Sequence, residues 1–272
     1  MVRSKKLNLN GEQLSLSFVI ILEFCTSIVA ICSGGSLLNH ISSGCTGFRF
    51  LGITLMVIGA ALLILSFTNC LLYRKPEISI AKSICCSVPL ILALLGLGIF
   101  ALAVSSKGGG KLIPGQSYKE YRVESYSKWM QNKVKKNWDN YYKKAVVDNK
   151  GLVCNELADL LGIDPALTSG CCKTPEECNF NNTNPKVWVK PANNGNYSED
   201  DCNRWDNDPN TLCFNCRSCK AGFLEDVTSH WFTTGIGLVL IAGIQMLMGI
   251  LCCIFSANLS LHHQGNRQPL LL

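Results

Sequence analysis

The sequence predicts an all-α membrane protein: a bundle of four transmembrane helices with a mainly helical large extracellular loop held together by disulfides. Three observations support this fold class. Of the 272 residues, 48% are hydrophobic and only 16% are charged, whereas soluble domains usually have about 25% charged residues. The apolar residues gather in four long runs, and cysteines gather in the long polar interval between the third and fourth runs.

Four segments are long enough to span a bilayer, because a helix needs about 20 mostly apolar residues to do so. They comprise residues 14–38, 50–72, 84–104 and 231–255. A cleaved signal peptide is the alternative for the first segment, because Arg3, Lys5 and Lys6 precede it. The long apolar run and Glu23 within it favour a membrane span.

Basic residues in the short loops predict the orientation. The first 13 residues and the interval 73–83 hold three Lys or Arg residues each, whereas the interval 39–49 holds only Arg49. We therefore expect residues 1–13, 73–83 and 256–272 to be cytoplasmic, and residues 39–49 and 105–230 to be extracellular. The net charge of +6 lies mostly on the cytoplasmic flanks, so it gives no reason to expect nucleic-acid binding.

Two N-glycosylation sequons agree with this orientation. Asn181 and Asn196 each begin an Asn-x-Ser/Thr triplet in the long loop, which makes both asparagines candidate glycosylation sites. A third triplet begins at Asn258, on the expected cytoplasmic side, and we expect it to stay unmodified.

Eight cysteines of the long loop predict a disulfide framework, because thiols in an oxidising compartment normally pair. They are Cys154, Cys171, Cys172, Cys178, Cys202, Cys213, Cys216 and Cys219. Many connectivities are possible, so the spacing alone assigns no pair. Adjacent cysteines rarely bridge each other, and we expect Cys171 and Cys172 to have different partners.

The spacing Cys213-x-x-Cys216-x-x-Cys219 allows three interpretations: structural disulfides, a metal site or thiol redox catalysis. The loop has no histidine before His230, so a zinc site would need thiolates alone. Structural disulfides fit the oxidising compartment best. We expect no metal, no cofactor and no enzymatic activity.

Five further cysteines lie at the cytoplasmic ends of the predicted spans. They are Cys70, Cys85, Cys86, Cys252 and Cys253. Juxtamembrane cysteines in this position are typical of reversible S-palmitoylation. The alternative is that they are small hydrophobic residues of the membrane region.

Two polar residues interrupt the predicted spans. Glu23 and Gln245 lie at similar depth, which permits a hydrogen bond between the first and fourth helices. An intramembrane carboxylate is a functional candidate, so a small transporter or channel using this pair is an alternative function. A protonated structural contact is the favoured interpretation, because the spans contain no other acid or base.

Small residues recur every seven positions in the spans, which predicts close helix packing in a left-handed bundle. They are Ser27 and Gly34; Gly52, Gly59 and Ser66; Gly96 and Ala103; Gly235, Ala242 and Gly249.

The beginning of the long loop predicts an amphipathic helix over residues 118–146, with apolar residues spaced four apart and lysines on the other face. The lysine face can bind anionic headgroups or acidic partners, although a solvated face is the favoured interpretation. A short helix is expected over residues 155–161, and little regular structure from residue 170 onward.

Motifs in the long loop resemble those of the tetraspanin family, and of its plant-type branch in particular. They are Gly170-Cys171-Cys172-Lys173, Cys178-Asn179-Phe180, the run 201–208, Leu212-Cys213, Cys216 and the run 218–222. Cys45 in the short loop and the layout of four spans are also similar. The chain departs from the plant-type pattern at Thr174, where a proline is expected, and at Glu23, which is atypical.

The resemblance implies a non-enzymatic scaffold of the plasma membrane that acts in cell–cell signalling or development. It implies lateral association with other tetraspanins, as homo- and hetero-oligomers, and with partner membrane proteins in microdomains. It further implies that the variable part of the loop, residues 186–201 here, contacts partners, and we expect Trp188, Val189 and Pro191 to do so. A solvated loop is the alternative. Membrane lipids are further expected partners.

Overall fold

The computed structural model describes residues 2–40, 46–71, 76–112, 119–142, 165–184, 187–191, 197–208 and 211–265. The chain divides into two compact units. The first unit comprises Met1–Ser36, Leu51–Phe100 and Thr234–Leu272, and the second comprises Leu37–Phe50 and Ala101–Thr233.

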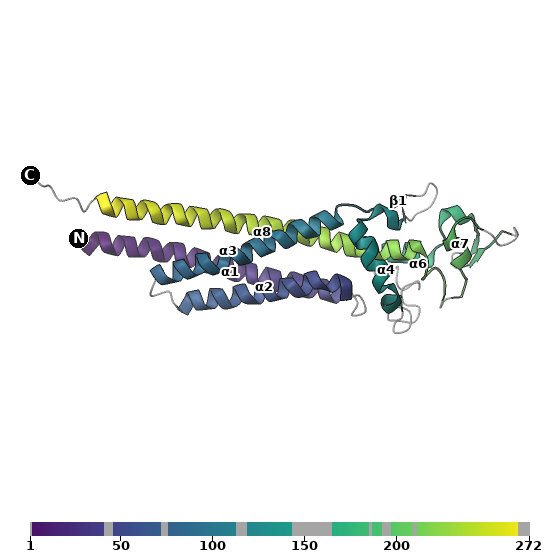
Figure 1. Cartoon of the computed structure of the whole chain (residues 1–272), viewed down its shortest axis with the longest axis horizontal. Coiled ribbons are helices and arrows are strands. Elements are labelled where there is room, and N and C mark those ends of the chain that lie inside the picture. The colour runs from purple at the N-terminus through teal and green to yellow at the C-terminus, as the bar shows by residue number, and fades with distance from the viewer. Residues whose placement is uncertain are drawn as a thin grey trace, which may run out of the picture. The chain divides into compact units, whose positions relative to one another are not determined.

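Four long helices carry the membrane-spanning segments and confirm the predicted fold class (Figure 1). They are α1 (Val2–His40), α2 (Thr46–Leu71), α3 (Pro76–Ser105) and α8 (Arg217–Gly265). The stretches long and apolar enough to cross a membrane are Leu16–Asn39, Phe48–Leu71, Cys86–Ser105 and Arg217–Ile254.

The helices extend beyond the segments predicted from hydropathy. α1 begins at Val2, and α3 begins at Pro76, within the interval expected to be a cytoplasmic loop. Hydropathy detects only the apolar part of each helix, whereas the backbone hydrogen bonds of the helix continue into polar flanking residues. Proline fits the first position of α3, because the first amide of a helix has no intrahelical partner.

Glycines bring α1 and α2 close together in the first unit. A Cβ added at Gly34 would lie 2.7 Å from the Gly52 carbonyl oxygen, and one at Gly59 would lie 3.0 Å from that of Ser27. Both glycines belong to the predicted seven-residue pattern. Such close approach allows the van der Waals contact that holds helices together in lipid.

The pattern was less accurate for α3 and α8. Gly98 packs against α8, where an added Cβ would lie 3.2 Å from the Gly235 carbonyl oxygen. A Cβ at Gly96 or Gly249 would meet no atom within 4 Å. The seven-residue spacing identified small residues, but it could not tell which of them face another helix.

The second unit is mainly helical, as predicted, and also contains two short antiparallel strand pairs. Its helices are α4 (Lys128–Tyr142), α6 (Pro165–Cys172), α7 (Asp200–Arg204) and the start of α8, with 3₁₀ turns at Val123–Ser125 and Glu176–Cys178. Its strands are β1 (Lys111–Leu112) paired with β2 (Lys119–Glu120), and β3 (Asn181–Asn184) paired with β4 (Val187–Val189). The pair β3–β4 forms in a part of the loop expected to have little regular structure.

Helix α4 packs the apolar face that its sequence predicts. Met130, Val134 and Trp138 recur every four residues and are all buried. The helix begins at Lys128, later than predicted, and the Ser127 hydroxyl accepts a hydrogen bond from the Met130 amide at 3.4 Å. Such a bond satisfies one amide of the first turn. The helix expected over residues 155–161 lies outside the described residues.

A buried tyrosine ties the segment after α3 to α8. The Tyr126 hydroxyl donates to the Glu225 carboxylate at 2.9 Å, and the Gly109 amide donates to the same oxygen at 3.0 Å. Burial, assisted by the Glu225 charge, raises the pKa of Tyr126 far above its usual range. Tyr126 therefore stays a neutral hydrogen-bond donor at physiological pH.

Candidate functional site

The cysteines of the large loop form a set of disulfides in the second unit. Cys171 pairs with Cys219, Cys178 with Cys202, and Cys213 with Cys216. Cys172 is also disulfide-bonded. The adjacent Cys171 and Cys172 thus have different partners, whereas Cys154 lies outside the described residues. The Cys171–Cys219 disulfide links α6 to the start of α8, and the Cys178–Cys202 disulfide links the 3₁₀ turn at Glu176–Cys178 to α7.

Gly170 allows α6 to lie directly against the backbone at the start of α8. A Cβ added at Gly170 would lie 2.4 Å from the Ser218 carbonyl oxygen. The Ser218 hydroxyl donates to the Gly170 carbonyl at 3.0 Å, and the Cys213 amide donates to the Cys171 carbonyl at 3.2 Å. We call Gly170, Cys171, Asp201, Ser218 and Cys219 the junction.

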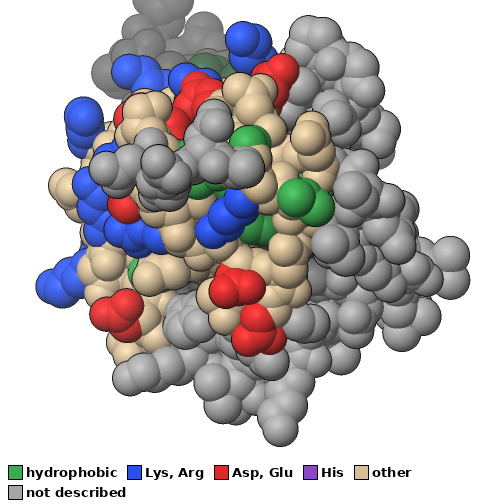
Figure 2. All heavy atoms as spheres, turned by 90° about the vertical axis from the view of Figure 1, so that its right-hand side faces the viewer, with side chains coloured by type: hydrophobic (Ala, Val, Ile, Leu, Met, Phe, Trp, Pro, Cys, Tyr) green, Lys and Arg blue, Asp and Glu red, His purple; other side chains and the backbone are tan. Residues whose placement is uncertain are grey.

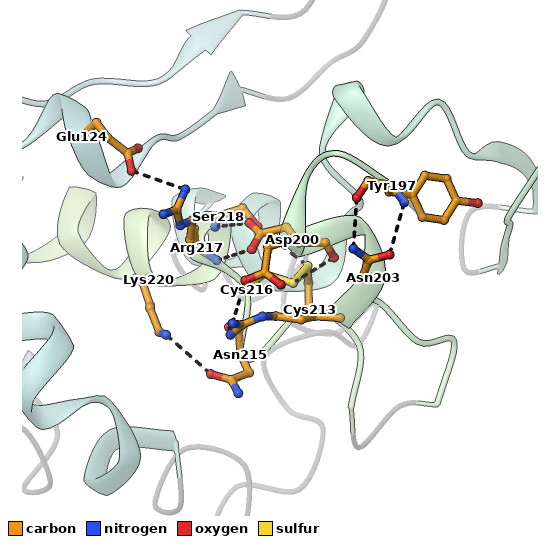
Figure 3. A network of polar contacts seen from close by, with 12 residues as sticks. Glu124, Tyr197, Asp200, Asn203, Cys213, Asn215, Cys216, Arg217, Ser218 and Lys220 are labelled. Carbon is orange, nitrogen blue, oxygen red and sulfur yellow. Dashed lines mark hydrogen bonds and ion pairs between the residues drawn. A yellow bond between two sulfur atoms is a disulfide. The ribbon is translucent and has the colours of Figure 1, made fainter. Parts of the chain in front are cut away.

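Asp201 of α7 caps the first turn of α8. Its carboxylate is 6% exposed and accepts hydrogen bonds from the amides of Arg217 at 2.8 Å and Ser218 at 3.0 Å. Figure 3 shows Arg217 and Ser218 near the Cys213–Cys216 disulfide. The first amides of a helix lack intrahelical partners, and a negative charge there also interacts favourably with the helix dipole.

The sequence did not reveal this role of Asp201. Helix-capping side chains are normally sought within a few residues of the helix start, whereas Asp201 lies 16 residues before Arg217. The related signal in the sequence is Cys202, which directly follows Asp201 and was expected to form a disulfide; its bond to Cys178 holds α7 in place.

Trp188 belongs to the core beneath the expected partner-contact region. It is 7% exposed and lies in one apolar cluster with Phe180, Trp205 and the Cys178–Cys202 disulfide. The Asn207 side chain accepts from the Trp188 amide at 3.0 Å and donates to its carbonyl at 2.9 Å. Trp188 therefore supports this surface from inside, contrary to the expectation that it contacts partners.

Val189 presents an exposed apolar side chain next to this support. It is 47% exposed, and Pro191 is half-buried, with its carbonyl accepting a hydrogen bond from the Tyr197 hydroxyl at 3.4 Å. Of the described residues outside the predicted spans, Leu112 and Val189 are the exposed large hydrophobic ones. Figure 2 shows charged side chains of both signs scattered over the described part of the end face, where few hydrophobic ones appear. We call β4 and residues 190–191 the contact strand.

The structure describes one of the two candidate glycosylation sites. Asn181 is exposed on β3, so its side chain is accessible. Asn196 lies outside the described residues.

Charged residues pair around a cleft of about 350 Å³ in the second unit. Arg122 pairs with Glu177, and Arg217 pairs with Glu124 at 3.8 Å. Burial raises the pKa of Glu120 at this cleft, and nearby Arg122 opposes the shift. The arginines of the cleft are therefore compensated by carboxylates of the same loop.

Glu23 joins three helices in the first unit. Its side chain is 3% exposed and accepts hydrogen bonds from Asn69 of α2 at 3.1 Å and from Ser87 of α3. The sequence did not identify Asn69 and Ser87 as hydrogen-bond partners of Glu23, because uncharged polar residues are common near the ends of membrane spans. The structural interpretation of Glu23 gains support from this geometry, and a transport path is not favoured.

The Gln245 side chain hydrogen-bonds to a residue other than Glu23, although the similar depth of Glu23 and Gln245 permitted a contact between the two. Its amide donates to the Thr26 hydroxyl of α1 at 2.7 Å. Thr26 lies three residues beyond Glu23, which is about 4.5 Å along the helix axis and nearly one turn around it. Depth estimates from sequence do not resolve a single helical turn.

The membrane-edge cysteines are free thiols where the structure describes them. Cys70, Cys86 and Cys253 are exposed, and Cys252 is half-buried. The Cys85 side chain lies outside the description. By contrast, the Cys213–Cys216 disulfide is fully buried, which does not favour the thiol oxidoreductase interpretation.

Comparison with known proteins identifies the family. The model of the Tetraspanin family matches residues 13–258. The chain is 32% identical to Tetraspanin-7 of Arabidopsis thaliana over 90% of this chain and 97% of that protein. It is 38% identical to Tetraspanin-8 of the same plant over 62% of this chain and 65% of that protein, and 34% identical to Tetraspanin-2 over 73% and 76%. No solved structure gives a significant match.

The match covers all four spans and the disulfide-linked loop between the third and fourth. This multi-pass membrane protein belongs to the tetraspanin family, and its similarity to Arabidopsis members supports the plant branch.

Proposed function

We propose that this protein organises partner membrane proteins laterally, forming microdomains with itself and with other tetraspanins in the plasma membrane. Membership of the tetraspanin family supports a scaffold that interacts with other membrane proteins. Cell–cell signalling or development is the proposed setting, and no catalytic activity is proposed. The observation that carries the proposal is the contact strand, an exposed apolar feature on a disulfide-linked support.

The contact strand suits protein recognition because it is rigidly held. The Cys178–Cys202 disulfide and the two Asn207 hydrogen bonds fix Trp188, which immediately precedes Val189. A pre-ordered strand loses little conformational entropy when a partner binds. An exposed apolar side chain on such a surface can be removed from water by a partner, which favours binding.

Val189→Asp is expected to reduce the recovery of partner proteins about tenfold, because a charge would be buried unpaired in the interface. Crosslinking in intact plant membranes, followed by mass spectrometry of the captured proteins, measures the effect. Leu112→Asp is the matched control, since Leu112 is 66% exposed in the same unit but lies on β1. Equal recovery from Val189→Asp and the unmodified chain, or equal losses in both variants, would contradict the role of the contact strand.

We also propose cytoplasmic termini, S-palmitoylation of the five membrane-edge cysteines and glycosylation of the large loop at Asn181 and Asn196. The two modifications would then mark opposite sides of the membrane. Replacing Cys70, Cys85, Cys86, Cys252 and Cys253 with serine is expected to remove metabolic palmitate labelling. An endoglycosidase is expected to shift the mass of this variant as it shifts the unmodified chain. Persistent palmitate labelling would show that these five cysteines are not the palmitoylation sites. A glycan at Asn258 would show that the C-terminus is extracellular, which contradicts the proposed orientation.

A further inference from the structure

An aromatic cluster places the start of α4 beside the first residues of two membrane spans. The Trp129 ring centroid lies 5.9 Å from that of Phe50 and 5.5 Å from that of Trp231, all within the second unit. Phe50 and Trp231 are the first residues of the predicted second and fourth spans. Tryptophan is enriched at membrane–water interfaces, and Trp129 is therefore positioned at such an interface.

Helix α4 also has an excess of positive charge. Its four lysines are Lys128, Lys133, Lys135 and Lys136, and Asp139 is its one acidic residue. Lys128, Lys135 and Lys136 are exposed, and Lys133 is half-buried. Among the described residues, none of these lysines has an ion pair, whereas Arg122, Arg204 and Arg217 all do. We call the four lysines the basic face of α4.

The basic face begins within reach of lipid headgroups. The Lys133 Nζ atom lies 5.4 Å from the Trp129 ring centroid, above the ring that contacts the span ends. Each headgroup layer of a bilayer is about 5–8 Å thick. Lysine side chains extend their charge toward the aqueous interface while their methylene groups cover apolar surface.

We infer that the basic face of α4, together with Trp129, binds the headgroups of anionic lipids in the leaflet where the second and fourth spans begin, which is the extracellular leaflet in the proposed orientation. Uncompensated lysines are attracted to an anionic surface within about one Debye length, roughly 8 Å at physiological salt. The contact between Trp129 and the span ends favours a lipid over an acidic protein as the occupant. The inference goes beyond the proposed scaffold function and does not depend on which proteins bind the contact strand.

The test uses the full-length protein in phosphatidylcholine nanodiscs that contain a photoreactive phosphatidylinositol. Mass spectrometry of the labelled peptides is expected to find the probe on α4. The triple variant K133Q/K135Q/K136Q is expected to reduce that labelling about tenfold, because each lysine near an anionic surface contributes to the attraction. Raising the salt concentration is expected to weaken labelling, because it screens the charges. K133R/K135R/K136R retains the charges and is expected to keep the labelling.

K107Q/K111Q/K119Q is the matched control, because it removes three exposed lysines from parts of the same unit outside α4 and the contact strand. This variant is expected to leave labelling of α4 unchanged. Three outcomes would overturn the inference: unchanged labelling in the α4 variant, an equal loss in the control, or equal labelling by a phosphatidylcholine probe. Capture of an acidic protein by α4 without lipid labelling would also overturn it. Recovery of partners through Val189 is measured separately, so failure of one proposal leaves the other intact.

Discussion

Gly170→Ala is expected to destabilise the large loop by about 3 kcal/mol or more and to impair formation of the Cys171–Cys219 disulfide. The added Cβ would lie 2.4 Å from the Ser218 carbonyl oxygen and 3.3 Å from the Cys219 Cα atom. Both are backbone atoms, which cannot move aside by changing a rotamer. Relief would require α6 to move away from α8, and that movement would separate the two sulfur atoms.

Non-reducing peptide mapping measures the Cys171–Cys219 disulfide, and thermal unfolding of the purified chain measures the stability. Gly237→Ala is the matched control, because Gly237 is also helical and an added Cβ there meets no atom within 4 Å. Both substitutions gain about 1 kcal/mol of helix propensity, so their difference isolates the steric effect. An unchanged disulfide and unchanged unfolding temperature in Gly170→Ala would show that the close approach is not required.

Asp201→Ala is expected to lower the free energy of unfolding by about 3 kcal/mol, because two charge-assisted hydrogen bonds from backbone amides are lost. The amides of Arg217 and Ser218 would lose the acceptor that caps the first turn of α8. The Ser218 carbonyl also faces Gly170. Fraying of this turn would therefore loosen the junction as a whole.

Asp200→Ala provides the control for Asp201→Ala. Asp200 is the adjacent residue, and its ion pair with Arg204 at 2.7 Å is exposed. Exposed ion pairs of this kind contribute about 0.3–0.5 kcal/mol, so this variant should unfold close to the unmodified chain. Chemical denaturation, followed by tryptophan fluorescence, distinguishes the two variants. If both lose the same stability, the carboxylate of Asp201 does not act as a cap.

The elements that hydropathy and periodicity can detect were predicted well. The four spans follow from local composition, because lipid requires about 20 apolar residues whatever the rest of the chain does. The apolar face of α4 follows from a spacing of four residues between Met130, Val134 and Trp138. The pair β3–β4 was missed, because Asn181 and Asn182 have little preference for strands.

The site depended on contacts between residues distant in the chain. Trp188 and Val189 are adjacent apolar residues, and nothing in the sequence distinguishes their roles. The structure distinguishes them, because Trp188 is packed in the core and Val189 is exposed. Asn69 and Ser87 became relevant because helix packing brings them to Glu23. Their residue types alone gave no reason to select them.

The sequence by itself determined the class of four-span membrane protein, the disulfide-bonded state of the seven described cysteines of the large loop and the tetraspanin resemblance, since each rests on composition or on short motifs. Only the tertiary structure decided the Cys171–Cys219 pairing, the role of Gly170 and the remote cap by Asp201. The physical reason is the same in all three cases. A disulfide, a steric limit and a hydrogen bond act over a few ångströms in space, and no pattern of sequence spacing specifies which distant residues meet at that range.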